Sequence, residues 1–438
     1  MTRRFRFLAP LAVAALVLAA CESGGDGSPG ASGGASACDT GDNKISILAV
    51  WATGDAEYES FKAMVEPFCE ETGIGIEYEG TRDANNILST RVQGGNPPDI
   101  AGLPGPGAMA EFARDDALVA LDDVVDLDRM ADEYGQSWID LGSVDDEVVG
   151  IFIKTSVKGP IWYNPANFEA AGYAVPESWD DLVALADQIQ ADGTAPWCIG
   201  LGSEAATGWP ATDWIEDILL RQSGPEAYTQ WYQGELPWTS DEVRSAFEAF
   251  GQWGANDDYV NGGVDGSISE TFQTGGDGLF TDPPECYLHH QASFITGLGA
   301  FVDQEAGTDY DFFMTPPIEQ DGVIAAGDLF GMFNDTPEAR QLMDYLTTAD
   351  AQQIWVERGG ALSPNKNVDL DAYPDDISRK SAEALVNSET VVFDGSDNMP
   401  AEMVEGFYTA ILDYIRNPDS LDAALEEADS VRESAYGS

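Results

Sequence analysis

The sequence has few basic residues and almost no histidine: 20 lysines and arginines stand against 78 aspartates and glutamates, beside two histidines. So acidic a chain repels the phosphate backbone, which excludes nucleic acid as a partner. His289 and His290 are adjacent and no C-x-x-C occurs among the five cysteines, which argues against a zinc site. We therefore expect no metal and no other cofactor.

Long hydrophobic runs are also scarce, and the one near the N-terminus covers only Leu8 to Ala20. Thirteen residues are too few to cross a bilayer, which takes about 20 in a helix. With basic residues before it, the run predicts an export signal over residues 1–20.

The end of this signal, Leu-Ala-Ala-Cys, resembles the bacterial lipobox. The resemblance implies cleavage before Cys21 and a lipid on its sulfur, which would anchor the protein at the extracellular face of the cell membrane. The alternative is an ordinary signal that happens to be cut near a cysteine. Residues 22–42 are mostly glycine, serine, alanine and aspartate, so burial cannot offset their ordering entropy. We expect residues 21–43 to be the lipidated cysteine and a flexible linker.

Removing residues 1–20 leaves 418 residues, enough for two ordinary domains. The remaining chain has 17 basic and 78 acidic residues, a net charge of −61. Acidic pairs interleaved with apolar positions indicate a solvated acidic surface suited to high salt, where screening weakens self-repulsion. Calcium binding is the alternative, but no segment has EF-hand spacing with its closing glutamate.

Four cysteines follow Cys21, and an even number in an exported protein favours disulfides. Three pairings are possible. Cys38 and Cys69 could join the N-terminal segment to the first helix, in which case Cys198 and Cys286 would close a long loop.

The hydrophobic pattern predicts alternating strands and helices at the start of the folded region. Apolar runs predict strands at 45–51, 74–80 and 97–103, and helical periodicity predicts helices at 56–73 and 85–95. This β-α-β-α-β order indicates a doubly wound α/β sheet. Later helices are expected to begin at Ser178, Thr239 and Thr336.

Enzyme signatures are absent from the predicted folded region: residues 44–438 have no G-x-S-x-G, P-loop, H-E-x-x-H or G-x-G-x-x-G motif. Carbohydrate hydrolases work with two carboxylates, but among 78 acidic residues any pair is uninformative. We therefore expect no enzyme, and an exported carbohydrate hydrolase remains the alternative.

Tryptophan and aspartate cluster in predicted turns, as in "VWATGDAEY", "YEGTRDANN", "ATGWPATDWIED" and "VFDGSDNMP". Sugars present apolar CH faces between hydroxyl groups, so a site for them needs flat rings beside carboxylates, amides and guanidinium groups. These turns are therefore candidate sugar contacts.

Several segments carry a family resemblance, in order, over nearly all of residues 44–430. "GGNPPDIAGLPGPGAMAEFARDDALVALD", "IWYNPANFEAAGYAVPESWDDL", "GWPATDWIEDILL" and "GGALSPNKNV" are among them. Together they resemble the extracellular family 1 solute-binding lipoproteins of ABC sugar importers, and within that family the alpha-glucoside-binding group.

The resemblance implies a two-lobed, type II periplasmic-binding-protein-like α/β fold with hinge crossings and an interlobe cleft. Lobe 1 is expected to comprise 44–153 plus 327–362, and lobe 2 to comprise 156–326 plus 363–438. The crossings would lie in "FIKTSVKG" and "AAGDLF".

The resemblance also places ligand-binding residues on the turns singled out above. Trp209 is expected to be the stacking ring, and Lys154 has an interlobe salt bridge as its alternative. For Phe407 the alternative is packing under Met403. The full set of expected ligand residues is Trp51, Asp55, Arg82, Asp83, Lys154, Glu204, Thr207, Trp209, Asp213, Gln291, Asp328, Asp397 and Phe407, with Glu57 in the same loop as Asp55.

The sequence thus predicts a monomeric, lipid-anchored receptor that captures an alpha-glucoside or similar oligosaccharide and presents it to the transmembrane permease of an ABC importer. No bond is made or broken. A receptor for a non-sugar solute on the same fold is a further alternative.

Overall fold

The computed structural model describes residues 35–38, 43–103 and 105–437. The predicted signal peptide, Cys21 and most of the predicted linker lie outside these residues. Among the helices of the described ranges, none combines the length and the apolar character that a membrane span needs.

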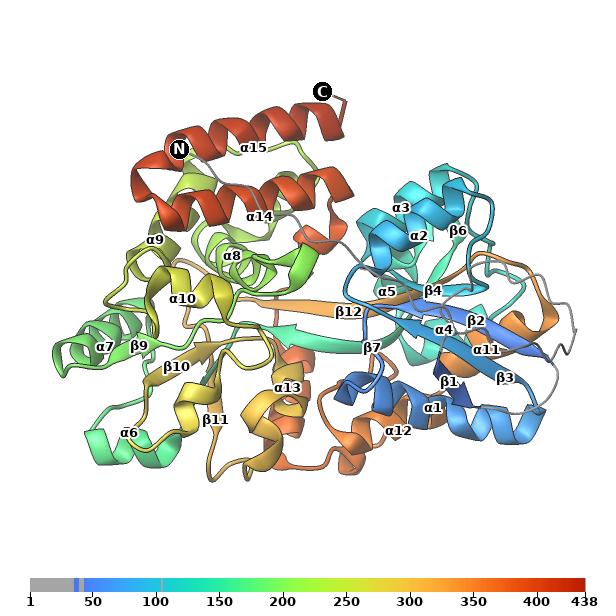
Figure 1. The fold of residues 1–438 in the computed structure, drawn as a ribbon, viewed down its shortest axis with the longest axis horizontal. Coiled ribbons are helices and arrows are strands. Elements are labelled where there is room, and N and C mark those ends of the chain that lie inside the picture. Colours follow the sequence, from blue (N-terminus) through green and yellow to red (C-terminus); the bar gives the residue numbers. More distant parts are fainter. Residues whose placement is uncertain (1–34, 39–42, 104, 438) are drawn as a thin grey trace, which may run out of the picture. The chain divides into compact units, whose positions relative to one another are not determined.

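Two β-sheets organise the fold (Figure 1). The larger has the order β1-β3-β2-β4-β12-β13, with β7 also paired to β12, and the smaller has the order β11-β8-β10-β9. The strands of the larger sheet are β1 (Ala35–Cys38), β2 (Lys44–Ala49), β3 (Gly75–Gly80), β4 (Ile100–Leu103), β7 (Gly150–Lys158), β12 (Val323–Met332) and β13 (Val391–Phe393). Those of the smaller are β8 (Pro160–Tyr163), β9 (Ala195–Trp197), β10 (Cys286–His290) and β11 (Asp311–Met314), and β5 (Ser143–Val144) pairs with β6 (Glu147–Val148).

Helices pack around each sheet to form two lobes, to which α13 (Asp376–Asn387) adds contacts with β7 and β12. The first lobe contains α1 (Ala56–Thr72), α2 (Ala84–Gln93), α3 (Pro106–Arg114), α4 (Leu127–Glu133), α5 (Gln136–Leu141), α11 (Pro337–Leu346) and α12 (Ala349–Arg358). The second contains α6 (Pro165–Ala171), α7 (Trp179–Ala191), α8 (Trp209–Tyr232), α9 (Asp241–Gly254), α10 (Gly263–Ser269), α14 (Ala401–Arg416) and α15 (Leu421–Ala435).

β2 lies inside the larger sheet and is covered on both faces. Ile45 and Ile47 join the core shared with α1, α11 and α12, whereas Leu48 joins the core shared with α2 and α3. Its neighbours β3 and β4 run parallel to it, as the β-α-β-α-β pattern predicts. Burial on both faces explains why this strand is almost continuously apolar in sequence.

Most of the predicted helix boundaries are confirmed. α1 ends at Thr72, and Gly73 follows it in the left-handed conformation with φ 72°. Ser178 and Thr336 cap α7 and α11 by accepting backbone N–H groups. The prediction that Thr239 begins the next helix is wrong by one residue, because Ser240 accepts the N–H of Val243 and caps α9.

The strands β7 and β12 lie side by side and connect the two lobes (Figure 1). They pair antiparallel, and the predicted crossing segments 152–159 and 325–330 fall largely within them. The first half of β12 pairs with β13, whereas its second half pairs with β4. Each strand therefore passes from the surroundings of one lobe to those of the other.

Two disulfides select one of the three pairings left open by the sequence. Cys38 bonds Cys69 of α1, and Cys198 bonds Cys286 of β10. The first bond holds β1, which pairs antiparallel with β3. The fold thus begins earlier than the predicted linker allows, because four of its residues, 35–38, form a strand.

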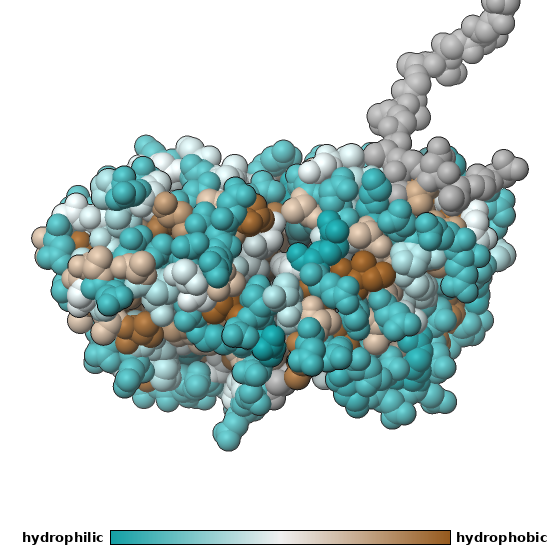
Figure 2. Space-filling view, turned by 90° about the horizontal axis from the view of Figure 1, so that it is seen from below, coloured by the Kyte–Doolittle hydropathy of each residue, from teal (hydrophilic) through white to brown (hydrophobic). Residues whose placement is uncertain are grey.

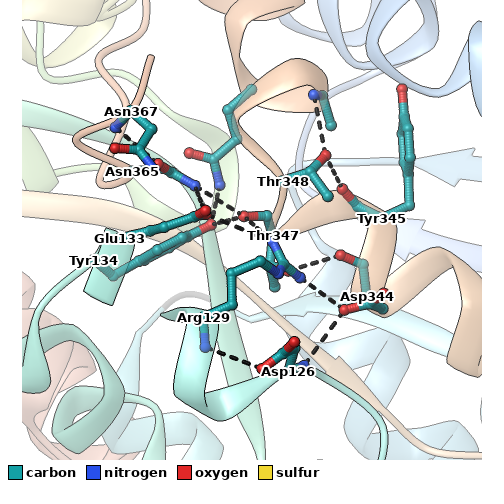
Figure 3. A network of polar contacts seen from close by, with 12 residues as sticks. Asp126, Arg129, Glu133, Tyr134, Asp344, Tyr345, Thr347, Thr348, Asn365 and Asn367 are labelled. Carbon is teal, nitrogen blue, oxygen red and sulfur yellow. Dashed lines mark hydrogen bonds and ion pairs between the residues drawn. The ribbon is translucent and has the colours of Figure 1, made fainter. Parts of the chain in front are cut away.

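A polar network fixes the chain after α12 to the first lobe (Figure 3). The guanidinium of Arg129, on α4, donates to Asp344 at 2.8 Å and to Thr347 Oγ1 at 2.7 Å. Asn365 donates through Nδ2 to Glu133 at 2.7 Å and to the Thr347 carbonyl at 3.2 Å. Three segments distant in sequence are held together here, so the chain leaves the first lobe toward α13 from a fixed point.

Candidate ligand-binding site

Three pockets lie where the two lobes meet, and each is lined by residues of both. The first, of about 160 Å³, lies between α2, α3 and α14 and includes Arg82, Asp83, Asp397 and Tyr408. The second, of about 300 Å³, joins Arg82 to residues 202–207 and 268–273. The third, of about 240 Å³, lies between the segments 56–60 and 355–360 of the first lobe and the segment 294–302 of the second. We call the region between the lobes that these pockets occupy the interlobe cleft.

Lys154 of β7 lies at the centre of one ionic cluster in this cleft. Its ammonium contacts Glu57 Oε1 at 3.1 Å and Asp328 Oδ2 at 2.9 Å, and Asp328 is its direct partner across β12. Arg82 contacts Glu57 Oε2 at 3.4 Å and Asp55 at 3.1 Å. Glu57 therefore joins both cations, and we call these five residues the Lys154 cluster.

Burial and charge oppose each other in the Lys154 cluster. Burial acts to raise the pKa of Glu57, but the attraction of Lys154 and Arg82 outweighs it and lowers that pKa. The pKa of Lys154 rises, since Asp328 and Glu57 outweigh the cost of burying the ammonium. Burial raises the pKa of Asp328 despite Lys154. The cluster thus keeps Lys154 and Glu57 charged.

A second ionic cluster surrounds Lys158, four residues further along β7 on the same face of the strand. Lys158 contacts Asp213 at 2.7 Å and Asp394 at 2.9 Å. The backbone N–H of Asp397 donates to Asp394 at 3.1 Å. Together with Glu216, which accepts the N–H of Gly395, these residues form the Lys158 cluster.

Carboxylates outnumber cations in the Lys158 cluster, and burial makes several of them weak acids. Burial raises the pKa of Asp213 to about 7, although Lys158 opposes the shift. It also raises the pKa of Asp397 and of Glu216 well above the ordinary range, with the Asp394 charge adding to both shifts. The pKa of Asp394 stays low, because Lys158 overcomes the effect of burial.

Aromatic rings stand beside both clusters. Trp209, at the start of α8, is partly buried and packs against Phe272 and Phe294, with ring centroids 5.2 and 6.0 Å apart. The ammonium of Lys158 lies 5.0 Å from the Trp209 ring centre. Phe272 and Phe294 line the second and third pockets, so they extend this aromatic surface into the cleft.

The lobes also meet backbone to backbone at one edge of the cleft. A Cβ placed on Gly360, which follows α12, would lie 3.2 Å from the Cα of Gly297 in the second lobe. The φ of Gly360 is 73°, in the left-handed region that favours glycine. A side chain at either position would require these two segments to move apart by a few tenths of an ångström.

Most of the predicted ligand residues lie together in the cleft. Five of them line pockets: Arg82, Asp83, Asp397, Glu204 and Thr207. Others lie in the two clusters or beside them: Asp55, Lys154, Asp213, Asp328 and Trp209. Lys154 forms salt bridges with Glu57 of α1 and Asp328 of β12, and neither partner belongs to the second lobe, so these are not the interlobe salt bridge that was its alternative role.

Three predicted residues have a different placement. Trp51 is 1% exposed and packs against Phe61, Phe330 and Trp355, so neither face of its ring is free. Phe407 is fully buried in the core of the second lobe, where it contacts Trp231 and Trp238. Gln291 is buried and its Oε1 accepts the N–H of its neighbour, while its Nε2 has no partner among the described residues. None of the three lines a pocket.

Lys158, Asp394 and Tyr408 are among the cleft residues that the sequence analysis missed. Lys158 has the same i, i+4 relation to Lys154 that places two strand residues on one face, so its spacing was a usable signal. Asp394 precedes Asp397 by three residues and is buried. Tyr408 follows Phe407 and lines the first pocket, because the rotation of about 100° between consecutive helical residues points Tyr408, and not Phe407, toward the cleft.

Comparison with known proteins places the chain in a family. Residues 51–353 match the bacterial extracellular solute-binding protein family. The osmoprotective compounds-binding protein GgtB of Synechocystis sp. is 40% identical over 421 residues, covering 95% of this chain and 96% of the relative. The alpha-glucosides-binding periplasmic protein AglE of Rhizobium meliloti is 39% identical over 394 residues, covering 87% of this chain and 85% of the relative.

The fold comparison agrees. A solved chitin oligosaccharide binding protein superimposes with a TM-score of 0.79 at 17% identity, covering 91% of this chain and all of the other. The two-lobed, type II α/β fold with its interlobe cleft is that of the periplasmic binding proteins. The chain belongs to the bacterial extracellular solute-binding protein family.

Proposed function

We propose that this protein is the substrate-binding component of an ABC carbohydrate importer and captures an alpha-glucoside in its interlobe cleft. The observation that carries the proposal is the composition of that cleft, where the Trp209 ring and its aromatic neighbours lie beside fixed carboxylates and a guanidinium. Apolar rings match the CH faces of a sugar, and charged groups match its hydroxyls.

The two relatives narrow the ligand class. One carries a name for alpha-glucosides and the other for osmoprotective compounds, at nearly equal identity to this chain. Trehalose and sucrose are alpha-glucosides that also act as osmoprotectants, so they head our ligand list. The protein works as a monomer and makes or breaks no bond. Sugar shifts the population toward the closed form because only that form contacts both faces of the ligand.

Isothermal titration calorimetry tests the ligand directly. Protein lacking residues 1–34 is titrated with trehalose, sucrose, maltose and glucose. We expect at least one alpha-glucoside to bind with a dissociation constant in the micromolar range, about 8 kcal/mol of binding free energy. Absence of heat and of thermal stabilisation with all four sugars would refute the assignment. If maltose or trehalose releases glucose during incubation, the protein is a hydrolase.

We also propose that Cys21 carries the lipid that anchors the protein at the extracellular face of the membrane, beside the permease. The Leu-Ala-Ala-Cys segment supports this proposal. Cys21→Ser should move the protein from the membrane fraction to the medium in the native host. Unchanged fractionation of this variant would rule out the anchor.

A further inference from the structure

The ion pairs of the cleft bear on the charge that its ligand carries. Three cations belong to the two clusters: Arg82, Lys154 and Lys158. Each is in contact with two carboxylates at 3.4 Å or less. The carboxylates are Asp55 and Glu57 for Arg82, Glu57 and Asp328 for Lys154, and Asp213 and Asp394 for Lys158.

Five carboxylates contact these three cations directly, so the net charge of the contacting groups is negative. Further acidic side chains, among them Asp83 and Glu204, line the pockets around them. An anionic ligand would have to displace a carboxylate from one of these cations. Lys154 and Lys158 are almost fully buried, where an unpaired charge is costly.

Aromatic rings hold the same cations in place. Arg82 stands 5.2 Å from the ring centre of Phe272, and Lys154 stands 5.0 Å from that of Trp355. Lys158 stands over Trp209 in the same way. A ring on one side and carboxylates on the other leave these cations little freedom to turn toward a ligand.

The Lys158 cluster also contains an acceptor without a donor. Asp213 is 2% exposed, and its Oδ2 has no hydrogen-bond partner among the described residues. Asp213 lies one helical turn after Trp209, on the same side of α8. Above about pH 7, where Asp213 is ionised, this oxygen accepts from a hydroxyl but repels an anion.

We infer that this cleft selects its ligand by charge, accepting neutral glycosides and excluding anionic ones such as sugar phosphates and uronic acids. The inference rests on the proposed function and adds a substrate class to it. Arg358 also lines the third pocket, but it is exposed, so solvent screens its charge.

A pair of ligands that differ in one phosphate tests the inference. Binding of trehalose and of trehalose 6-phosphate is measured by calorimetry at pH 7.5, in 0.1 M and in 1 M NaCl. We expect the phosphate to weaken binding at least 100-fold at both salt concentrations. Repulsion by the acidic surface alone would largely disappear in 1 M NaCl, where the Debye length falls to about 3 Å.

Glu57→Gln provides the complementary variant, because Glu57 is shared by Arg82 and Lys154. The dissociation constant of trehalose 6-phosphate divided by that of trehalose measures the discrimination between the two ligands. Loss of this one negative charge should reduce this ratio about tenfold. Asp192→Asn is the control, because it also removes one negative charge. The Asp192 side chain accepts a hydrogen bond from the Tyr173 hydroxyl, and this variant should leave the ratio of dissociation constants unchanged. Circular dichroism establishes that both variants fold.

The outcomes are distinct. If trehalose binds and its phosphate does not, in either salt, the inference holds. Selection by the paired cations is refuted if the two dissociation constants lie within tenfold of each other, or if their difference disappears in 1 M NaCl. The receptor function stands in both cases. If neither binds and the panel of neutral sugars also fails, the sugar-receptor function is refuted and the inference falls with it.

Discussion

Phe407 and Tyr408 are consecutive residues of α14 that point about 100° apart around its axis: Phe407 is fully buried among Trp231, Trp238 and Phe247, and Tyr408 lines the first pocket. Their alanine variants should therefore fail in different ways. Comparing the two variants therefore distinguishes a loss of stability from a loss of sugar binding at neighbouring residues.

Phe407→Ala should lower the free energy of unfolding by about 3 to 5 kcal/mol, because it leaves a cavity in a packed aromatic core. Urea denaturation followed by fluorescence measures the loss. Tyr408→Ala should unfold within about 1 kcal/mol of the unmodified protein but bind its sugar about tenfold more weakly. Equal affinity of Tyr408→Ala and the unmodified protein would remove Tyr408 from the site.

Trp209→Ala should cost about 1 to 3 kcal/mol of sugar-binding free energy, as expected of an aromatic ring that contacts the ligand. Trp214→Phe is its control. Trp214 lies in the same helix but is buried and stacks on His290 with ring centres 4.2 Å apart. The control should lose stability and keep its affinity. If Trp209→Ala also keeps its affinity in calorimetry, Trp209 belongs to the scaffold.

Removal of the Cys198–Cys286 disulfide should destabilise the protein more than removal of Cys38–Cys69. The first closes a loop with a sequence separation of 88 residues and the second one of 31. Chain entropy gives about 4 to 5 and about 3 to 4 kcal/mol, respectively. Double Cys→Ser variants of each pair are compared by urea denaturation. The opposite order would show that local packing dominates over loop closure.

Asp213 should make the protein less stable as the pH rises toward neutrality. Its carboxyl keeps a proton up to about pH 7 in the folded chain, because burial raises its pKa, whereas the unfolded chain releases that proton near pH 4. The folded state thus binds more protons between these values. Its contribution to the free energy of unfolding is largest below about pH 4 and declines as the pH rises through about 7.

Asp213→Asn isolates this contribution, because asparagine does not titrate. The free energy of unfolding of the unmodified protein, minus that of the variant, should fall between pH 4.5 and pH 7.5. Urea denaturation at both pH values gives the four numbers needed. A difference that rises with pH would mean that the ion pair with Lys158 outweighs burial at this site.

The sequence predicted most of the first lobe, because β2, β3 and α1 carry complete local signals: apolar runs, helical spacing and a terminal glycine. It missed β1, since its four small residues carry no apolar strand pattern; β1 pairs with β3 beside the Cys38–Cys69 bond. Pairing across β7 and β12 joins segments about 170 residues apart, which no local pattern records.

The candidate site was predicted at the level of turns and less well at the level of side chains. Arg82, Asp83 and Trp209 were found because polar and aromatic residues stand together in their turns. Trp51 sits in an equally polar turn, yet its ring turns inward to Phe61 and Trp355. The direction of a side chain depends on tertiary packing, which a single sequence does not display.

The contact between Gly297 and Gly360 has a consequence for the free energy of bringing the lobes together. Neither residue has a side chain to immobilise, so bringing these two segments together costs no rotamer entropy at the point of contact. A binding protein that closes and opens repeatedly benefits from such a contact. Closure there has a low entropic cost, and opening separates no interdigitated side chains.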